Sequence, residues 1–281
     1  MMMPFAAASP HISVKAEELV TVGGVSITNS TMAGALGVVI LLLLFVWTHR
    51  VAVGKAKPNF ATKLMTWAFD GLYNTVAQII PDREIAKKVA PLPITIFFFV
   101  LVQYWTGILP FVGPAVYVPQ GVEHTPLLRS QVADLNMTFA LAIITIVAAQ
   151  VYAIKYLGFF GNAGRYLVNP IKNPIGTFVG LLELIAEFSR MLGLSFRLFG
   201  NVLAGEVLLI MIAFLAQYIS PIALQPFFIF ELFIGGIQAY IFFMLSTVFI
   251  SLGLGHHGGD EKEHATTSSA HSSSASVATE G

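Results

Sequence analysis

The fold is decided by one long stretch, IGTFVGLLELIAEFSRMLGLSFRLFGNVLAGEVLLIMIAFLAQYIS, residues 175–220. This stretch is mostly apolar, and no proline interrupts it between Pro174 and Pro221. A continuous helix of about 40 residues measures roughly 60 Å, which is about twice the hydrocarbon thickness of a bilayer. The stretch either breaks into two spans or forms one long helix that lies strongly tilted in the membrane, and the lack of proline favours the single helix.

Other apolar stretches of membrane-spanning length occupy residues 31–48, 93–112, 135–154 and 226–254. The chain of 281 residues is 56% hydrophobic and 11% charged, with a mean hydropathy of +0.78. Soluble domains carry about 25% charged residues. The sequence thus predicts an all-α membrane protein with about five membrane-embedded helices, the last two long, strongly tilted and paired as a hairpin.

Residues 59–80 have the spacing of an amphipathic helix. Its predicted apolar face consists of Phe60, Leu64, Trp67, Ala68, Leu72, Val76 and Ile79. Its charged residues make it a poor membrane span, so we predict a helix at the membrane interface or along other helices. Residues 113–131 form a predicted connector that contains Pro and Gly.

Three segments are predicted along the chain. Residues 1–30 form an extramembrane segment, residues 31–254 the membrane-embedded helical domain, and residues 255–281 a disordered tail rich in Ser and His. The histidines of this tail have no preorganised geometry for a metal ion, so a solvated tail is the preferred interpretation. No basic stretch precedes a short apolar run near the start, and we predict no cleaved signal peptide.

The distribution of basic residues predicts the orientation of the chain. Seven basic residues follow the first span and three follow the third, whereas the opposite side has only Lys15 and Arg129. Basic loops stay in the cytoplasm, so we predict an outside N-terminus and a cytoplasmic C-terminus.

Composition excludes several classes of function. Fifteen basic residues balance fifteen acidic ones, so no overall field would recruit nucleic acid. The absence of Cys excludes disulfides, thiolate catalysis and Cys-ligated metals. The sequence has no phosphate-binding loop, catalytic triad or metal-ligand cluster in its predicted ordered part, so we predict no cofactor, no metal and no catalysis by this chain alone.

Ionisable residues nevertheless interrupt the apolar stretches, although a charge at the bilayer centre costs at least ~2.5 kcal/mol. At about 100° per residue, a narrow polar stripe beside Arg197 consists of Glu183, Glu187, Arg190 and Asn201. Glu206 lies about 180° from Arg197. Glu231 and Gln238 share a face of the next helix, and an antiparallel hairpin could bring Glu231 and Glu206 into one polar pocket.

Arg197 demands an explanation because a guanidinium cannot become neutral by losing its proton. Glu187, the nearest acid on its face of the helix, is roughly 15 Å away. We therefore predict a partner carboxylate outside this chain; the alternative is a structural arginine bound to backbone carbonyls or lipid headgroups. Glu206 and Glu231 can carry a proton as neutral acids, which suits a relay, or they can share a proton that merely locks the hairpin.

The segment ELIAEFSRMLGLSFRLFGNVLAGE, residues 183–206, resembles the a subunit of F-type ATP synthases. Supporting matches are ITNS at 27–30, ADLNMT at 133–138 and IQAYIFFMLSTVFIS at 237–251. The resemblance implies a half-barrel of tilted helices beside a rotating ring of c subunits, with b subunits of the peripheral stalk, the rest of the synthase and membrane lipid as further partners. Protons would enter by one half-channel, ride the ring and leave by another, which couples the proton gradient to ring rotation and ATP synthesis.

The same resemblance implies roles for individual residues. Arg197 looks like the stator arginine that holds the ring carboxylate ionised, and Glu206 and Glu231 look like proton carriers of the inlet half-channel. The resemblance further implies Asn201 and Gln238 as polar neighbours of the inlet, Glu183 at the outlet, and Asp134 and Asn136 at the outer mouth. Some family members have His where Glu231 stands, so this chain would use two carboxylates instead.

Two other functional classes are weighed against this one. A secondary transporter would show internal repeats and discontinuous helices, and no convincing repeat is present. A purely structural scaffold does not explain Arg197. The proton is the default ion, although the ring site would decide between H⁺ and Na⁺. The ITNS segment and the basic loop favour a bacterial plasma membrane over an organellar one.

Overall fold

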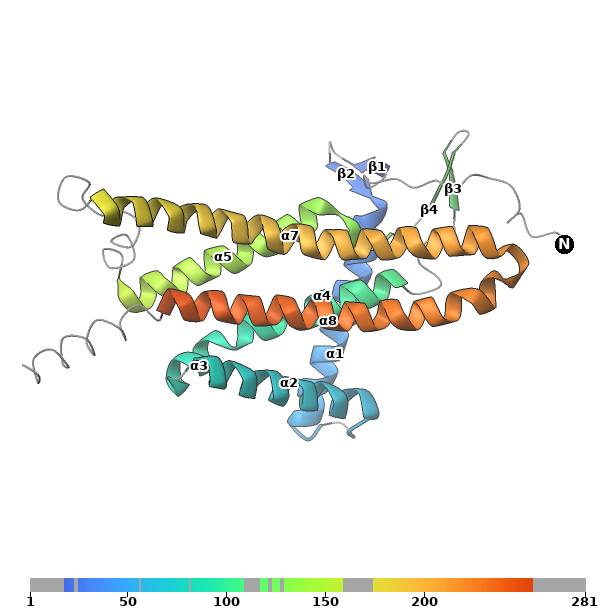
Figure 1. Ribbon diagram of the computed structural model, residues 1–281. Helices are drawn as coiled ribbons and strands as arrows, with labels where there is room; N and C mark the ends of the chain where they lie inside the picture. Colours follow the sequence, from blue (N-terminus) through green and yellow to red (C-terminus); the bar gives the residue numbers. More distant parts are fainter. Residues whose placement is uncertain are drawn as a thin grey trace, which may run out of the picture.

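The structure is a computed structural model that describes residues 18–22, 25–55, 57–80, 82–108, 117–120, 123–126, 129–158 and 174–254 (Figure 1). Its helices are α1 (Asn29–Ala52), α2 (Phe60–Ile79), α3 (Arg83–Val89), α4 (Pro91–Ile108), α5 (Leu135–Leu157), α7 (Pro174–Ala216) and α8 (Ser220–Leu254). Short 3-10 turns, η1 (Gln131–Ala133) and η2 (Gln217–Ile219), precede α5 and α8. Two antiparallel hairpins pair β1 (Glu18–Val22) with β2 (Val25–Thr28) and β3 (Tyr117–Gln120) with β4 (Glu123–Pro126).

The all-α membrane architecture predicted from the sequence is confirmed. Among the described residues, four helical stretches are long and apolar enough to cross a membrane, namely Asn29–Ala52, Arg83–Ile108, Leu135–Tyr156 and Thr177–Leu254. The last stretch contains both α7 and α8. The β3–β4 hairpin lies in the connector that the sequence predicts only as a Pro- and Gly-containing segment. The predicted tail at 255–281 and most of the N-terminal segment lie outside the described residues.

Helices α7 and α8 form a long antiparallel hairpin that runs the length of the molecule (Figure 1). Helix α7 has 43 residues and α8 has 35. Helices α4 and α5 pack along the hairpin, whereas α1 runs across it (Figure 1). At 1.5 Å per residue, α7 is about 65 Å long and α1 only about 36 Å, which is close to a bilayer thickness.

The turn of this hairpin corrects one predicted boundary. The sequence placed the start of the last helix at Pro226, whereas α8 begins at Ser220 and contains Pro226. Pro221 fits because a helix needs no backbone N–H donor in its first turn. The chain reverses at Gln217, whose φ of 44° lies in the left-handed region.

Helix α2 is the predicted amphipathic helix, but only part of its apolar face is buried. Leu72 and Val76 are buried in a core cluster with α3, α4 and α8. Phe60 and Trp67, near the start of the helix, remain 82% and 74% exposed. The C-terminal half of α2 therefore packs on the protein, whereas its N-terminal half presents aromatic residues outward.

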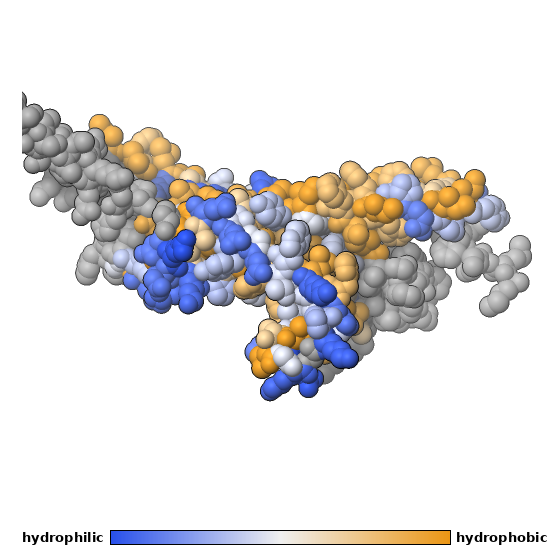
Figure 2. Space-filling view, turned by 90° about the horizontal axis from the view of Figure 1, so that it is seen from below, coloured by the Kyte–Doolittle hydropathy of each residue, from blue (hydrophilic) through white to orange (hydrophobic). Residues whose placement is uncertain are grey.

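A second core cluster lies where α4, α5, α7 and α8 meet. Its buried side chains include Val100, Leu141, Leu198, Val202, Ala239 and Phe242. Outside this core, large apolar side chains are exposed along α1, α5, α7 and α8. Figure 2 shows apolar residues over much of the long body and hydrophilic residues in separate patches. Such extensive apolar surface fits a protein surrounded by lipid.

Candidate functional site

Arg197 lies near the middle of α7 with its side chain exposed. Among the described residues, it forms no hydrogen bond or ion pair. A Cβ added at Gly193 or Gly200, one turn to either side, would meet no atom within 4 Å. Arg197 therefore stands on an open, small-residue surface where a group from outside the chain has room to approach.

Asn201 and Gln238 connect the two helices of the hairpin one turn from Arg197. The Asn201 Nδ2 donates to the Gln238 Oε1 at 2.8 Å. Gln238 is buried, and its Nε2 has no hydrogen-bond partner among the described residues. This hydrogen bond joins the two residues that the resemblance names as polar neighbours of the inlet.

Glu231 lies deeper in the protein, on the same face of α8 as Gln238. Its side chain is only 5% exposed, and its Oε1 accepts a hydrogen bond of 2.6 Å from the Tyr104 hydroxyl of α4. The carboxylate also lies directly against Gly205 of α7. A buried acid in this setting requires a hydrogen-bond partner, and Tyr104 supplies it.

Glu206 has a different partner. Its Oε2 accepts from both Nε and Nη2 of Arg129, each at 3.2 Å. The Arg129 side chain is 7% exposed and the Glu206 side chain 30% exposed. Glu231 lies against Gly205, the residue before Glu206, but the two acids bind different residues, and the described residues show no hydrogen bond between them.

Asp134 caps the first turn of α5. Its Oδ1 accepts from the backbone N–H of Asn136 at 2.9 Å, and its Oδ2 accepts from the Ser30 hydroxyl at 3.2 Å. The ITNS and ADLNMT segments, far apart in the sequence, therefore meet here. The side chain of Asn136 is exposed.

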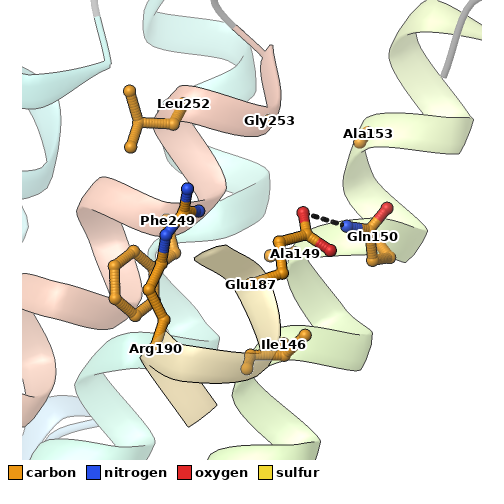
Figure 3. A pocket seen from close by; sticks show the side chains of 9 residues that line it. All are labelled: Ile146, Ala149, Gln150, Ala153, Glu187, Arg190, Phe249, Leu252 and Gly253. Carbon is orange, nitrogen blue, oxygen red and sulfur yellow. Dashed lines mark hydrogen bonds between the residues drawn. The ribbon is translucent and has the colours of Figure 1, made fainter. Parts of the chain in front are cut away.

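On the other side of Arg197, a small cavity opens between α5, α7 and α8 (Figure 3). Glu187 faces Gln150 across it and accepts from the Gln150 Nε2 at 2.6 Å. The Arg190 guanidinium lies over the ring of Phe249, 5.5 Å from its centroid. About 20 Å³ is open to the centres of water molecules, which is room for at least one water. Glu183 lies one turn further along α7, half-buried.

Tyr104, Arg129 and Gln150 are members of these clusters that the sequence does not single out. In the sequence, Arg129 serves only as one of the basic residues that indicate the orientation of the chain. Tyr104 and Gln150 are polar side chains within predicted membrane spans, and a polar residue in such a span is the signal that could have identified them. Among the described residues, no group of three or more His, Asp or Glu side chains could hold a metal ion.

Comparison with known proteins gives one consistent family. The family described as ATP synthase A chain matches residues 31–251. ATP synthase subunit a of Enterococcus hirae is 32% identical over 220 residues, which cover 76% of this chain and 85% of that protein. ATP synthase subunit a of Mycobacterium ulcerans is 30% identical over 226 residues, 80% of this chain and 86% of that protein. The subunit of the same name in Aliivibrio fischeri strain MJ11 is 32% identical over 218 residues, 75% of this chain and 79% of its own. The chain belongs to the ATP synthase A chain family.

Proposed function

We propose that this chain carries protons to and from a rotor ring along two offset half-channels, and that Arg197 separates them. Its family makes it a non-catalytic, proton-translocating subunit of the membrane sector of ATP synthase, and an integral membrane protein. The half-channels, the ring of c subunits as the facing partner, the b subunits of the peripheral stalk and the coupling to rotation are parts of the proposal.

The main support for this proposal is the exposure of the Arg197 side chain. A guanidinium keeps its charge, so an arginine among apolar residues needs an anion. Arg197 has no such partner among the described residues and stands beside Gly193 and Gly200, where another helix could approach closely. A carboxylate on a passing ring subunit would satisfy the charge and be held ionised by it.

Polar residues on both sides of Arg197 support two separate paths. Toward the turn of the hairpin, the inlet consists of Glu206, Glu231 and Gln238 with Asn201. Toward the start of α7, the outlet consists of Glu183 and the cavity beside Glu187. Because α7 is about 65 Å long, it must lie tilted to remain within the bilayer. Such a tilt would extend the two paths toward opposite membrane surfaces.

The remaining assignments concern orientation and location. The basic residues after α1 and α5 favour a cytoplasmic position for those loops, an outside N-terminus and a cytoplasmic C-terminus. Asp134 and Asn136, at the start of α5, would then lie at the outer mouth. We assign the chain to a bacterial plasma membrane.

ATP-driven proton pumping in vesicles that contain the whole complex tests the proposal. The Arg197→Ala variant should lose pumping, while the complex still assembles. Arg50→Ala, at the exposed end of α1, is the matched control and should pump normally. Passive proton leak through the membrane sector is recorded in both. Pumping by Arg197→Ala at the control level would show that Arg197 is structural and would overturn the proposal.

A further inference from the structure

Tyr104 is a large buried side chain in contact with Glu231, a candidate proton carrier. It is 1% exposed, and its hydroxyl donates to the Oε1 of Glu231 at 2.6 Å. A hydrogen bond this short between a neutral donor and a carboxylate belongs to the strong class of protein hydrogen bonds. Glu231 accepts no other hydrogen bond from the described residues.

Two glycines make room for this pair. A Cβ at Gly235 of α8 would collide with the ring of Tyr104, and a Cβ at Gly205 of α7 would collide with the Glu231 carboxylate. The ring therefore lies directly against the backbone of α8, and the carboxylate lies directly against the backbone of α7. A side chain at either glycine would fill the space that the tyrosine ring or the carboxylate now occupies.

The neighbouring residues hold α4 and α8 in fixed register. The Nε1 of Trp105 donates to the backbone carbonyl of Leu232 at 3.2 Å, one residue beyond the Tyr104–Glu231 pair on both helices. The hydroxyl of Tyr104 is consequently directed at Glu231 by the backbone contact beside it as well as by packing.

We propose that Tyr104 is a positioning residue of the inlet, whose hydroxyl fixes the Glu231 carboxyl so that its Oε2 receives and passes on the proton. This inference rests on the proposed function. The proton forms a bond to Oε2 when it arrives, and that bond breaks when the proton leaves toward Gln238 and the ring. The Tyr104 hydroxyl keeps its own proton throughout, so Tyr104 never bears a charge.

The Tyr104→Phe variant tests this inference because it removes the hydroxyl and keeps the ring that fills the space at Gly235. Proton pumping by the whole complex should fall about tenfold, since a displaced proton carrier loses its alignment. Tyr152→Phe is the matched control: it also removes one hydroxyl, which donates to the carbonyl of Lys88 at 3.2 Å, and should leave pumping unchanged.

A spectroscopic measurement separates positioning from a structural role. In infrared difference spectra of the purified complex, the carbonyl stretch assigned by Glu231→Gln should move to higher frequency in Tyr104→Phe and stay in place in Tyr152→Phe. Equal pumping and an unmoved band in both tyrosine variants would overturn the inference. Arg197→Ala would still be inactive in that case, so the proposed function would survive. Normal pumping by both Arg197→Ala and Glu231→Gln would instead overturn the proposed function, and this inference with it.

Discussion

The two halves of the α7–α8 hairpin treat their polar side chains differently. Toward the turn, Glu231 and Glu206 each have one specific partner from another element. Toward the start of α7, Glu187 also has a partner, Gln150 of α5, but Glu187 and Arg190 in addition line a cavity with room for water. In the half toward the turn, proton transfer would depend on a few fixed side chains. In the half with the cavity, which we call the open half, water could replace a missing side chain. Substitutions should therefore have larger effects near the turn than near the cavity.

Among substitutions that compare the two halves, the largest effect is expected for Glu231→Gln. Glutamine keeps an acceptor for the Tyr104 hydroxyl but cannot carry a proton, so pumping in vesicles should fall by about 100-fold. Gln225→Ala, on the exposed part of α8 near the turn, serves as control and should pump normally. If Glu231→Gln pumps within about twofold of the control, Glu231 does not carry protons along the inlet.

A smaller effect is expected for Arg129→Ala, which removes the guanidinium from Glu206. Hydrogen bonds to charged groups contribute about 1.5–3 kcal/mol, so the variant should lower the thermal stability of the subunit and reduce pumping about tenfold. A double-mutant cycle with Glu206→Ala measures the pair. The two substitutions should be strongly non-additive, and simple additivity would contradict a functional ion pair.

The open half should be more tolerant. Glu187→Gln keeps an oxygen that accepts from Gln150, and water in the cavity can still carry protons, so pumping should fall only about two- to threefold. The measurement is the same vesicle assay, with Glu231→Gln tested in parallel. A loss as large as that of Glu231→Gln would show that the two halves do not differ.

The smallest effect concerns Asp134, where capping and proton transfer can be separated. Asp134→Ala removes the cap of α5 and should cost about 1 kcal/mol of stability, whereas Asp134→Asn keeps a capping oxygen and should cost much less. Thermal unfolding of both variants checks this. If Asp134→Asn is stable but pumps poorly, Asp134 takes part in proton transfer as well as capping.

Periodicity and length predicted most of the fold from the sequence. The 43-residue helix follows from an apolar stretch without proline, and the hairpin follows from two such stretches in succession. The start of α8 did not follow, because Pro226 is a common helix boundary and nothing local reveals that this helix continues through it. For α2 the sequence left open a position at the membrane interface or along other helices, since amphipathic spacing identifies a face but not what covers it.

The site was predicted in part for a similar reason. Helical spacing predicted that the hairpin could bring Glu231 and Glu206 into one polar pocket, and Glu231 does lie against Gly205, next to Glu206. It could not assign partners from other elements, because Tyr104 and Arg129 reach the hairpin only through the packing of α4 and of the segment before η1. Those contacts are separated by more than 70 residues in the sequence, and no local pattern specifies them.

The central claim is that the residues on the two sides of Arg197 communicate with opposite sides of the membrane. The chain has no cysteine, so one introduced thiol is the only one in this subunit. Asn201→Cys and Gln150→Cys, in complexes whose other subunits lack reactive thiols, would be exposed to silver ions from each side of oriented vesicles. Phe242→Cys, in the buried core, is the control that should react from neither side. We expect Asn201→Cys to react only from the outer side and Gln150→Cys only from the cytoplasmic side. Reaction of both thiols from the same side would contradict two separate half-channels.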